Sequence, residues 1–191
     1  VSRGTIVDAS IISAPSSTKN KKKERDPDMH QTRKGKQWYF GMKAHIGVDS
    51  RTKLIHSVAA TPANVHDSQV LPDLLHGEET RVWGDSAYTG QKAAITDCAP
   101  RARDFTQAKG TRHRMLTDDE RSRNRNKSRV RAKVEHQFGI IKRQFGFTKV
   151  RYRGLDKNAH RLFVACALSN LVMAKKTLLK RNRLVLQASC A

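Results

Sequence analysis

The chain has 191 residues, about the length of one domain, and its 38 Lys and Arg against 17 Asp and Glu give a formal net charge of +21. This charge favours a polyanionic partner, with nucleic acid first and an anionic membrane surface second. The three cysteines are odd in number and far apart, which excludes a disulfide framework, and the longest apolar run, residues 162–174, is too short to span a bilayer.

The first third of the chain predicts three strands and a basic loop. Residues 4–13 are β-branched and apolar around one acidic residue, which is typical of a strand. Residues 14–37 are polar and strongly basic and predict a surface loop, whose lysines are either solvated or in contact with phosphate. Residues 38–49 and 54–61, joined by a turn-like segment, predict an antiparallel hairpin.

The middle of the chain predicts alternating helices and strands. Residues 64–75 have a helical pattern in which Pro72 marks a kink or a break. Residues 81–85 form a short strand, and residues 91–97 form a helix. Residues 102–106 predict a fifth strand.

Long helices follow. Thr117 and Glu120 have the spacing of a capping box and predict the start of a helix. That helix either is long or breaks near residues 124–126, and a strong helical pattern then continues to Phe145. A final helix is predicted over residues 156–179.

This order of elements predicts an α/β domain over residues 1–179. A hairpin sheet extended by strands that are joined through helices suits a mixed five-stranded sheet flanked by helices, as in ribonuclease H-like domains. We expect the loop of residues 14–37 on its surface and a short basic insertion, residues 107–124, before the last helix of the site. Residues 180–191 form a basic tail that we expect to be frayed.

Two aspartates lie where folding alone would not place them. Asp8 interrupts an apolar strand, where an unpaired charge is costly to bury; an edge strand or a strand end is the alternative. Asp85 ends an apolar strand beside Gly84, and ligand sites collect at such strand ends. A cap for the following helix would also explain Asp85.

Glu135 is the third acidic candidate. Apolar residues at helical spacing define one stripe of its helix: Val130, Val134, Phe138, Ile141 and Phe145. At about 100° per residue, Arg131, Glu135 and Lys142 fall together at the border of this stripe. Glu135 would then emerge where the helix meets the sheet, although a surface ion pair with Arg131 is the simpler interpretation.

Three carboxylates suit one kind of chemistry. Mg²⁺ prefers oxygen ligands, and phosphodiester chemistry on DNA usually uses two such ions held by carboxylates. No His and Cys set has zinc-ligand spacing, and no phosphate-cradling glycine loop of the ATP-binding type occurs. Trp38, Tyr39 and Trp83 are either core residues, the more common role for aromatic side chains in strands, or platforms for a flipped base.

Five segments of the chain, in order, resemble the DDE transposases of bacterial insertion sequences, in the family numbered five. They are GTIVDAS, HQTRKGKQWYFGMKAHIGVDS, TPANVHDSQVLPDLL, VWGDSAYTG and RVRAKVEHQFGIIKRQFG. The resemblance covers residues 4–179 and implies a ribonuclease H-like fold. It also implies that Asp8, Asp85 and Glu135 are the catalytic residues and hold two Mg²⁺ or Mn²⁺ ions.

The family's C-terminal signature, Tyr-x2-Arg-x3-Glu-x6-Lys, matches Arg131, Glu135 and Lys142 at both spacings. It implies that Arg131 and Lys142 bind DNA. Ser128 occupies the tyrosine position, which removes a phenol but no metal ligand. The family usually carries an N-terminal region that recognises the transposon ends, and only seven residues precede Asp8, so we expect a truncated or split-frame copy.

The resemblance implies metal-dependent nicking of DNA followed by transfer of the 3′-OH to target DNA. It implies transposon ends and target DNA as partners, a homo-oligomer on DNA, no membrane partner, and a cytoplasmic, nucleoid-associated location in bacteria. Two alternatives stay open. One is a ribonuclease H-fold nuclease or resolvase that cuts without joining, and the other is a non-catalytic basic protein that binds nucleic acid.

Overall fold

A six-stranded mixed sheet forms the centre of the protein. The computed structural model describes residues 3–188, and its side chains over residues 3–175 and 177–180. The strands are β1 (Gly4–Ser13), β2 (His30–Lys34), β3 (Gln37–Asp49), β4 (Ile55–Pro62), β5 (Arg81–Trp83) and β6 (Arg103–Asp104). Their order is β2-β3-β1-β5-β6, with β4 also paired to β3. The mixed sheet with flanking helices is the ribonuclease H-like architecture predicted from the sequence.

The sheet is antiparallel on one side of β1 and parallel on the other. β3 pairs antiparallel with β4, as the hairpin pattern predicted, and also antiparallel with β1. β5 and β6 continue the sheet in parallel. The prediction of five strands was one short, because β2 lies inside the segment assigned to the basic loop. Its polar residues carry no alternating apolar pattern, and only pairing with β3 defines it as a strand.

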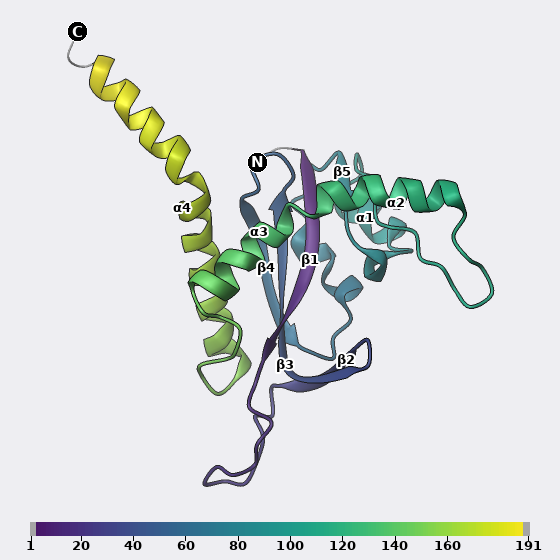
Figure 1. The fold of residues 1–191 in the computed structure, drawn as a ribbon, viewed down its shortest axis with the longest axis vertical. Helices are drawn as coiled ribbons and strands as arrows, with labels where there is room; N and C mark the ends of the chain where they lie inside the picture. Colours follow the sequence, from purple (N-terminus) through teal and green to yellow (C-terminus); the bar gives the residue numbers. More distant parts are fainter. Residues whose placement is uncertain (1–2, 189–191) are drawn as a thin grey trace.

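β3 is long enough to have two partners along one edge. β4 pairs with Met42–Val48, and β2 pairs with Gln37–Gly41, beyond the end of β1. The change of partner falls at Gly41. Here β3 also lies so close to β1 that a Cβ atom would be 2.1 Å from the carbonyl oxygen of Ile12. β2 and the first part of β3 therefore form a two-stranded ribbon (residues 30–41), which bends away from the central sheet (Figure 1).

Helices and short helical turns cover both faces of the sheet. The α-helices are α1 (Lys92–Cys98), α2 (Asp118–Arg131), α3 (Val134–Gly139) and α4 (Leu155–Ala188). A π-helical turn follows α3 over Ile140–Gln144, and single 3₁₀ turns span Asp67–Val70, Pro72–Leu74 and Ser86–Tyr88. The capping box at the start of α2 was predicted correctly. The Thr117 hydroxyl accepts a hydrogen bond from the backbone N–H of Glu120, and the Glu120 carboxylate accepts one from the backbone N–H of Thr117.

Two predicted helices and the predicted insertion differ from the structure. Residues 64–75 contain two 3₁₀ turns rather than one helix, and the break falls at Pro72, which lacks a backbone N–H. The final helix extends to Ala188 and includes most of the predicted frayed tail. Within the predicted insertion of residues 107–124, only the part before Asp118 is irregular. In the described part of the chain, no helix is both long and apolar enough to cross a membrane.

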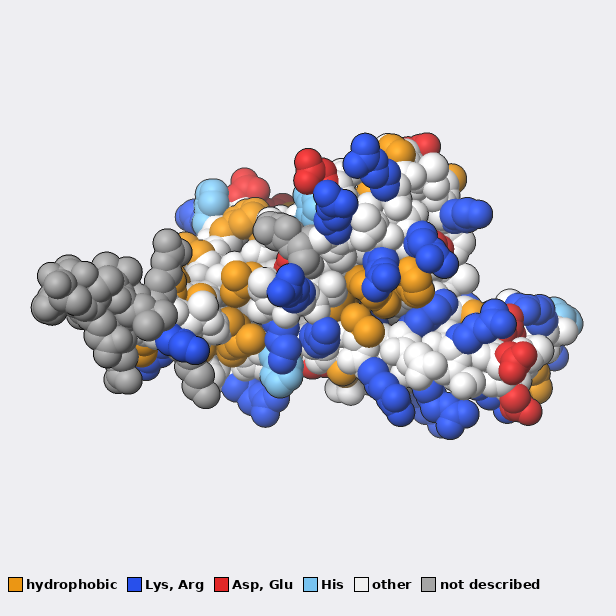
Figure 2. Space-filling view, turned by 90° about the horizontal axis from the view of Figure 1, so that it is seen from above, with side chains coloured by type: hydrophobic (Ala, Val, Ile, Leu, Met, Phe, Trp, Pro, Cys, Tyr) orange, Lys and Arg blue, Asp and Glu red, His pale blue; other side chains and the backbone are white. Residues whose placement is uncertain are grey.

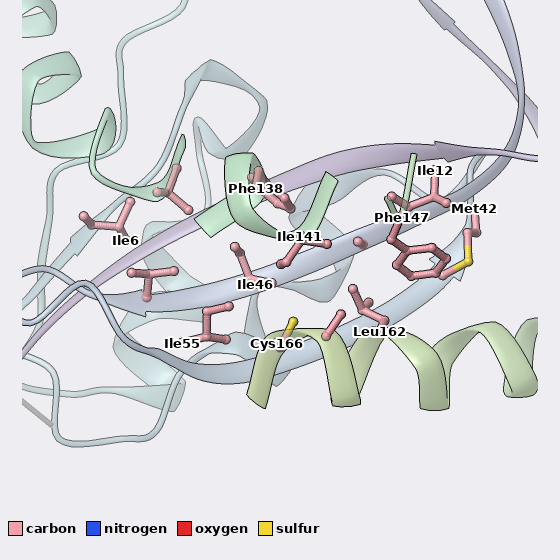
Figure 3. Close-up of a cluster of buried hydrophobic side chains, with 14 of the residues drawn as sticks. Ile6, Ile12, Met42, Ile46, Ile55, Phe138, Ile141, Phe147, Leu162 and Cys166 are labelled. Carbon is pink, nitrogen blue, oxygen red and sulfur yellow. The ribbon is translucent and has the colours of Figure 1, made fainter. Parts of the chain in front are cut away.

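The core has one cluster on each face of the sheet. On one face, β1 and β3 contribute Ile6 and Ile46, which pack with Phe147 and with Leu162 and Cys166 of α4 (Figure 3). On the other face lie Val7 of β1 and six residues of the 3₁₀ turns, β5 and α1: Val70, Leu71, Leu74, Val82, Tyr88 and Ile95. Because Ile6 and Val7 point to opposite faces, β1 is buried on both, which explains its nearly continuous apolar sequence.

Buried His45 makes stability depend on pH. It lies fully buried on β3, with Nε2 2.8 Å from the Thr61 hydroxyl, and burial lowers its pKa from 6.5 to about 4. The unfolded chain therefore binds this proton at a higher pH than the folded chain. The stability contributed by neutral His45 is complete above pH 6.5 and is lost as the pH falls toward 4.

We expect the free energy of unfolding to fall by up to about 3 kcal/mol through this group over that window. His45→Gln cannot be protonated, so its unfolding free energy should depend less on pH over the same range. Urea titrations of both proteins above pH 6.5 and near pH 4 measure the difference. Parallel losses in the two proteins would show that His45 does not carry the effect.

Candidate active site

A pocket opens where β5 ends and one edge of β1 becomes free. β5 pairs only with Gly4–Ile6, so β1 has no strand partner on that side from Val7 until Ser13, which forms an isolated bridge with Lys149. The pocket has a volume of about 440 Å³ and lies at the carboxyl end of a parallel strand, where open α/β sheets bind ligands. Its lining is Asp8, Ala9, Ser10, Ile11, Thr32, Arg33, Lys34, Lys43, Asp67, Asp85, Arg131, Glu135 and Phe138.

Asp8 is the most buried carboxylate of the pocket, with 8% of its surface exposed. Its Oδ2 lies 3.1 Å from Nη1 of Arg131, and its Oδ1 accepts a hydrogen bond from the backbone N–H of Ala9 at 2.9 Å. Burial raises the pKa of Asp8 to about 7, although Arg131 opposes the shift. The charges of Asp85 and Glu135 raise this pKa further, so all three carboxylates share one electrostatic environment.

Asp85 follows β5 and performs a structural task as well. Its Oδ1 accepts a hydrogen bond from the backbone N–H of Ala87 at 2.8 Å and caps the turn Ser86–Tyr88. The capping role considered from the sequence is therefore present. It does not remove Asp85 from the pocket, because one carboxylate oxygen makes the cap and the side chain still lines the cavity.

Glu135 reaches the pocket from α3. Its neighbours Val134 and Phe138 are buried in the core, and Ile141 is fully buried one turn further on, so the apolar stripe was predicted correctly. Its side chain is 62% exposed, and its Oε1 lies 3.9 Å from Nη1 of Arg131. The ion pair with Arg131 is thus also present, and it lies inside the pocket rather than on a remote surface.

The two predicted DNA-binding cations are both held by the protein. Arg131 Nη1 lies between the carboxylates of Asp8 and Glu135. Lys142 is partly buried, and its Nζ donates to the carbonyl oxygen of Ile11 on the free edge of β1 at 2.9 Å. Burial lowers the pKa of Lys142, with a smaller contribution from Lys34. Both cations border the carboxylates, but neither is a freely extended surface charge.

The pocket includes residues that the sequence did not single out. Lys43 of β3 donates to Asp67 Oδ1 at 2.8 Å, across a separation of 24 residues that no local pattern reveals. Arg33 and Lys34 of β2 also line the pocket. The sequence placed both in the predicted basic loop, so neither was considered as a site residue.

The three aromatic candidates differ in how far they are buried. Trp83 is 8% exposed and packs on Phe105 with ring centroids 5.5 Å apart, so it is a core residue. Trp38 is 64% exposed, whereas Tyr39 is partly buried and donates its hydroxyl to Gln37 Oε1. Ser128, at the position where the family has tyrosine, accepts a hydrogen bond from Gln107 Nε2 at 2.6 Å.

Positive charge surrounds the carboxylates. Lys and Arg side chains are spread over the face drawn in Figure 2, in keeping with the net charge of +21. Across residues 3–188, no three His, Cys, Asp or Glu side chains are gathered closely enough to hold a metal ion as they stand. The guanidinium of Arg131 is the cation that lies between Asp8 and Glu135. The donor set is made of carboxylate oxygens, which suit a hard divalent cation.

The chain was compared with models of known protein families. A family model described as transposase DDE domain matches residues 1–171. The match includes β1, the end of β5, and α3, which are the three segments that carry Asp8, Asp85 and Glu135.

Proposed function

Because the family model spans residues 1–171, this chain belongs to the DDE transposases, and we propose that it nicks DNA and transfers the 3′-OH to target DNA. One observation supports this proposal most directly. Acidic side chains from three separate segments, at Asp8, Asp85 and Glu135, line a single pocket in a strongly basic protein. A protein that only binds nucleic acid gains nothing from carboxylates that face phosphate.

We propose that Asp8, Asp85 and Glu135 hold two Mg²⁺ or Mn²⁺ ions. When bound, the metals would activate the attacking hydroxyl and stabilise the leaving oxygen. The pocket suits positive charge, because the Arg131 guanidinium already lies between Asp8 and Glu135. Burial raises the pKa of Asp8, and a nearby cation is what keeps such a carboxylate ionised.

The remaining pocket residues would position the DNA. Arg131 lines the pocket, and Lys142 lies beside it on the carbonyl oxygen of Ile11; both are proposed to bind phosphates next to the scissile bond. Asp85 is fixed by its bond to Ala87, and Asp8 by its bond to Ala9, so both carboxylates are oriented before DNA arrives. Such preorganised charges lower the barrier because they need not rearrange during the reaction.

We further propose that the element is a bacterial insertion sequence of the family numbered five. Transposon ends and target DNA would be the partners, bound by a homo-oligomer. Because the substrate is the chromosome, the protein would act in the bacterial cytoplasm at the nucleoid.

A strand-transfer assay tests the proposal. Labelled DNA that carries the ends flanking the gene is incubated with the protein and Mg²⁺ or Mn²⁺, and both nicked and joined products are measured. A transposase gives both products, and omission of the metal removes both. A resolvase-type nuclease would nick without joining, and a passive binder would give neither product.

Lys142→Ala is expected to weaken DNA binding and to reduce its dependence on salt. Each phosphate neutralised contributes a slope of about −0.9 in a plot of log affinity against log salt, so the slope should become shallower by about one. Fluorescence anisotropy of labelled duplex DNA over a salt series measures both quantities. Lys157→Ala, an exposed lysine outside the pocket, is the matched control. An unchanged slope for Lys142→Ala would remove this residue from the phosphate contacts.

A further inference from the structure

The ribbon of residues 30–41 forms the wall of the pocket opposite α3. β2 runs to Lys34, the chain turns at Gly35 with a φ of +62°, and β3 begins at Gln37. Arg33 and Lys34 line the same cavity as Asp8. The ribbon contains Arg33, Lys34 and Lys36 and no acidic residue. Its charge therefore suits a polyanion.

The cations of the ribbon are less engaged in contacts within the protein than the cations of α2 and of the π-helical turn. Among the described ion pairs, none includes Arg33 or Lys34. Arg33 donates through Nε to the carbonyl oxygen of Gly35 at 3.1 Å, a bond inside the ribbon that orients the guanidinium. Arg131, in contrast, is paired with Asp8, and Lys142 is bound to the backbone of β1.

Trp38 is the large apolar side chain of the ribbon that faces solvent. It is 64% exposed, whereas the second tryptophan of the chain, Trp83, is 8% exposed. Trp38 lies directly opposite Arg33 in the β2–β3 register, so the two side chains share one face of the ribbon. An exposed indole beside a guanidinium is the combination that single-stranded nucleic acid uses, with a base on the ring and a phosphate on the cation.

We propose that this ribbon binds an unpaired DNA strand where it leaves the active-site pocket. Arg33 and Lys34 bind phosphates of the strand, and a base stacks on Trp38. The strand must be unpaired, since a base in an intact duplex has no face free for the indole. This inference rests on the proposed function, which makes DNA the substrate of the adjacent carboxylates.

The arrangement also explains why the ribbon differs from the rest of the sheet. The central strands are buried on both faces, whereas Gln37 and Trp38 are exposed and the residues of β2 are largely so. The β1–β3 pairing ends at Gly41, where the missing Cβ lets the backbone lie close to Ile12, and the ribbon extends beyond this point. A ribbon that served only to extend the core would bury its largest side chain.

Tryptophan fluorescence tests the proposal without requiring catalysis. The chain has two tryptophans, so Trp38→Phe leaves Trp83 as the only source of emission. The parent protein is titrated with single-stranded oligothymidine and with a duplex of equal length, in the absence of divalent metal, while anisotropy of the labelled DNA reports binding. We expect the single strand to quench the tryptophan emission of the parent and to leave the emission of Trp38→Phe unchanged.

Affinity measurements complete the test. Trp38→Ala should weaken binding of the single strand about tenfold and affect duplex binding much less. Tyr152→Ala, which removes an exposed aromatic ring outside the pocket, should change neither. Arg33→Ala should make the salt slope for single strands shallower by about 0.7, whereas Lys157→Ala, which removes an exposed lysine of α4, should not. Thermal unfolding of each variant verifies that it is folded.

The ribbon inference and the proposed function fail in different ways. If oligothymidine binds but the parent emission does not change, or if Trp38→Ala binds as tightly as Tyr152→Ala, the ribbon does not hold the strand. Nicking and joining by the same preparation would then leave the proposed function intact. Quenching through Trp38 without strand chemistry in Mg²⁺ or Mn²⁺ would support the ribbon and contradict the enzyme.

Discussion

Asp8→Asn is expected to abolish both nicking and joining of DNA. The substitution keeps the size of the side chain and removes the negative charge that would hold the metal beside Arg131. Loss of one preorganised electrostatic group typically lowers a rate by about a hundred- to a thousandfold, and we expect at least this effect. Single-turnover assays with labelled transposon ends measure the two steps separately. Asp85→Asn and Glu135→Gln should behave alike.

DNA affinity distinguishes this effect from a loss of binding. Each carboxylate repels phosphate when no metal is present, so Asp8→Asn should bind DNA as tightly as the parent or more tightly. Asp97→Asn is a matched control, because Asp97 is an exposed carboxylate of α1 outside the pocket. A Glu135→Gln protein that joined ends at the parental rate would show that Glu135 is not the third ligand.

Phe147→Ala is expected to have the largest effect on stability. Phe147 is fully buried between the sheet and α4, and the guanidinium of Arg161 lies 5.0 Å from its ring centroid. Replacement leaves a cavity and removes the cation–π contact, so the free energy of unfolding should fall by about 3–5 kcal/mol. Urea denaturation followed by circular dichroism measures this difference.

The control is an exposed phenylalanine on the neighbouring helix. Phe163 of α4 is 47% exposed, and Phe163→Ala should change the free energy of unfolding by less than about 0.5 kcal/mol. Equal losses in the two variants would mean that the helix containing Phe163 contributes to stability through a contact outside the described core.

The sequence predicted those parts of the fold that depend on local patterns. The apolar β1 strand, the β3–β4 hairpin and the Thr117 capping box each follow from side chains a few residues apart. β2 was missed because its strand character comes from pairing with β3 and not from its own residues.

The same distinction applies to the site. Asp8 and Asp85 were identified because each is unusual in its own segment, and Glu135 because it lies at the border of an apolar helical stripe; all three line one pocket. The ion pair between Lys43 and Asp67 joins distant segments, and no local sequence pattern predicts it. The sequence also could not show that Arg131 is paired with Asp8, since that contact spans 123 residues.

The small buried surface of α2 affects how readily this helix unfolds locally. The helix has no buried residue, and its contacts with the domain include the bonds of Lys127 to the Thr106 carbonyl and of Asn124 to the backbone of Ala108. Segments with so little buried surface exchange their amide hydrogens through local unfolding, well before the central strands do. Arg131 is the last residue of α2, so we expect fraying that reaches the end of the helix to break the contact between its guanidinium and Asp8. Access of solvent and ions to this carboxylate would then depend on local unfolding of a helix that has no buried residue.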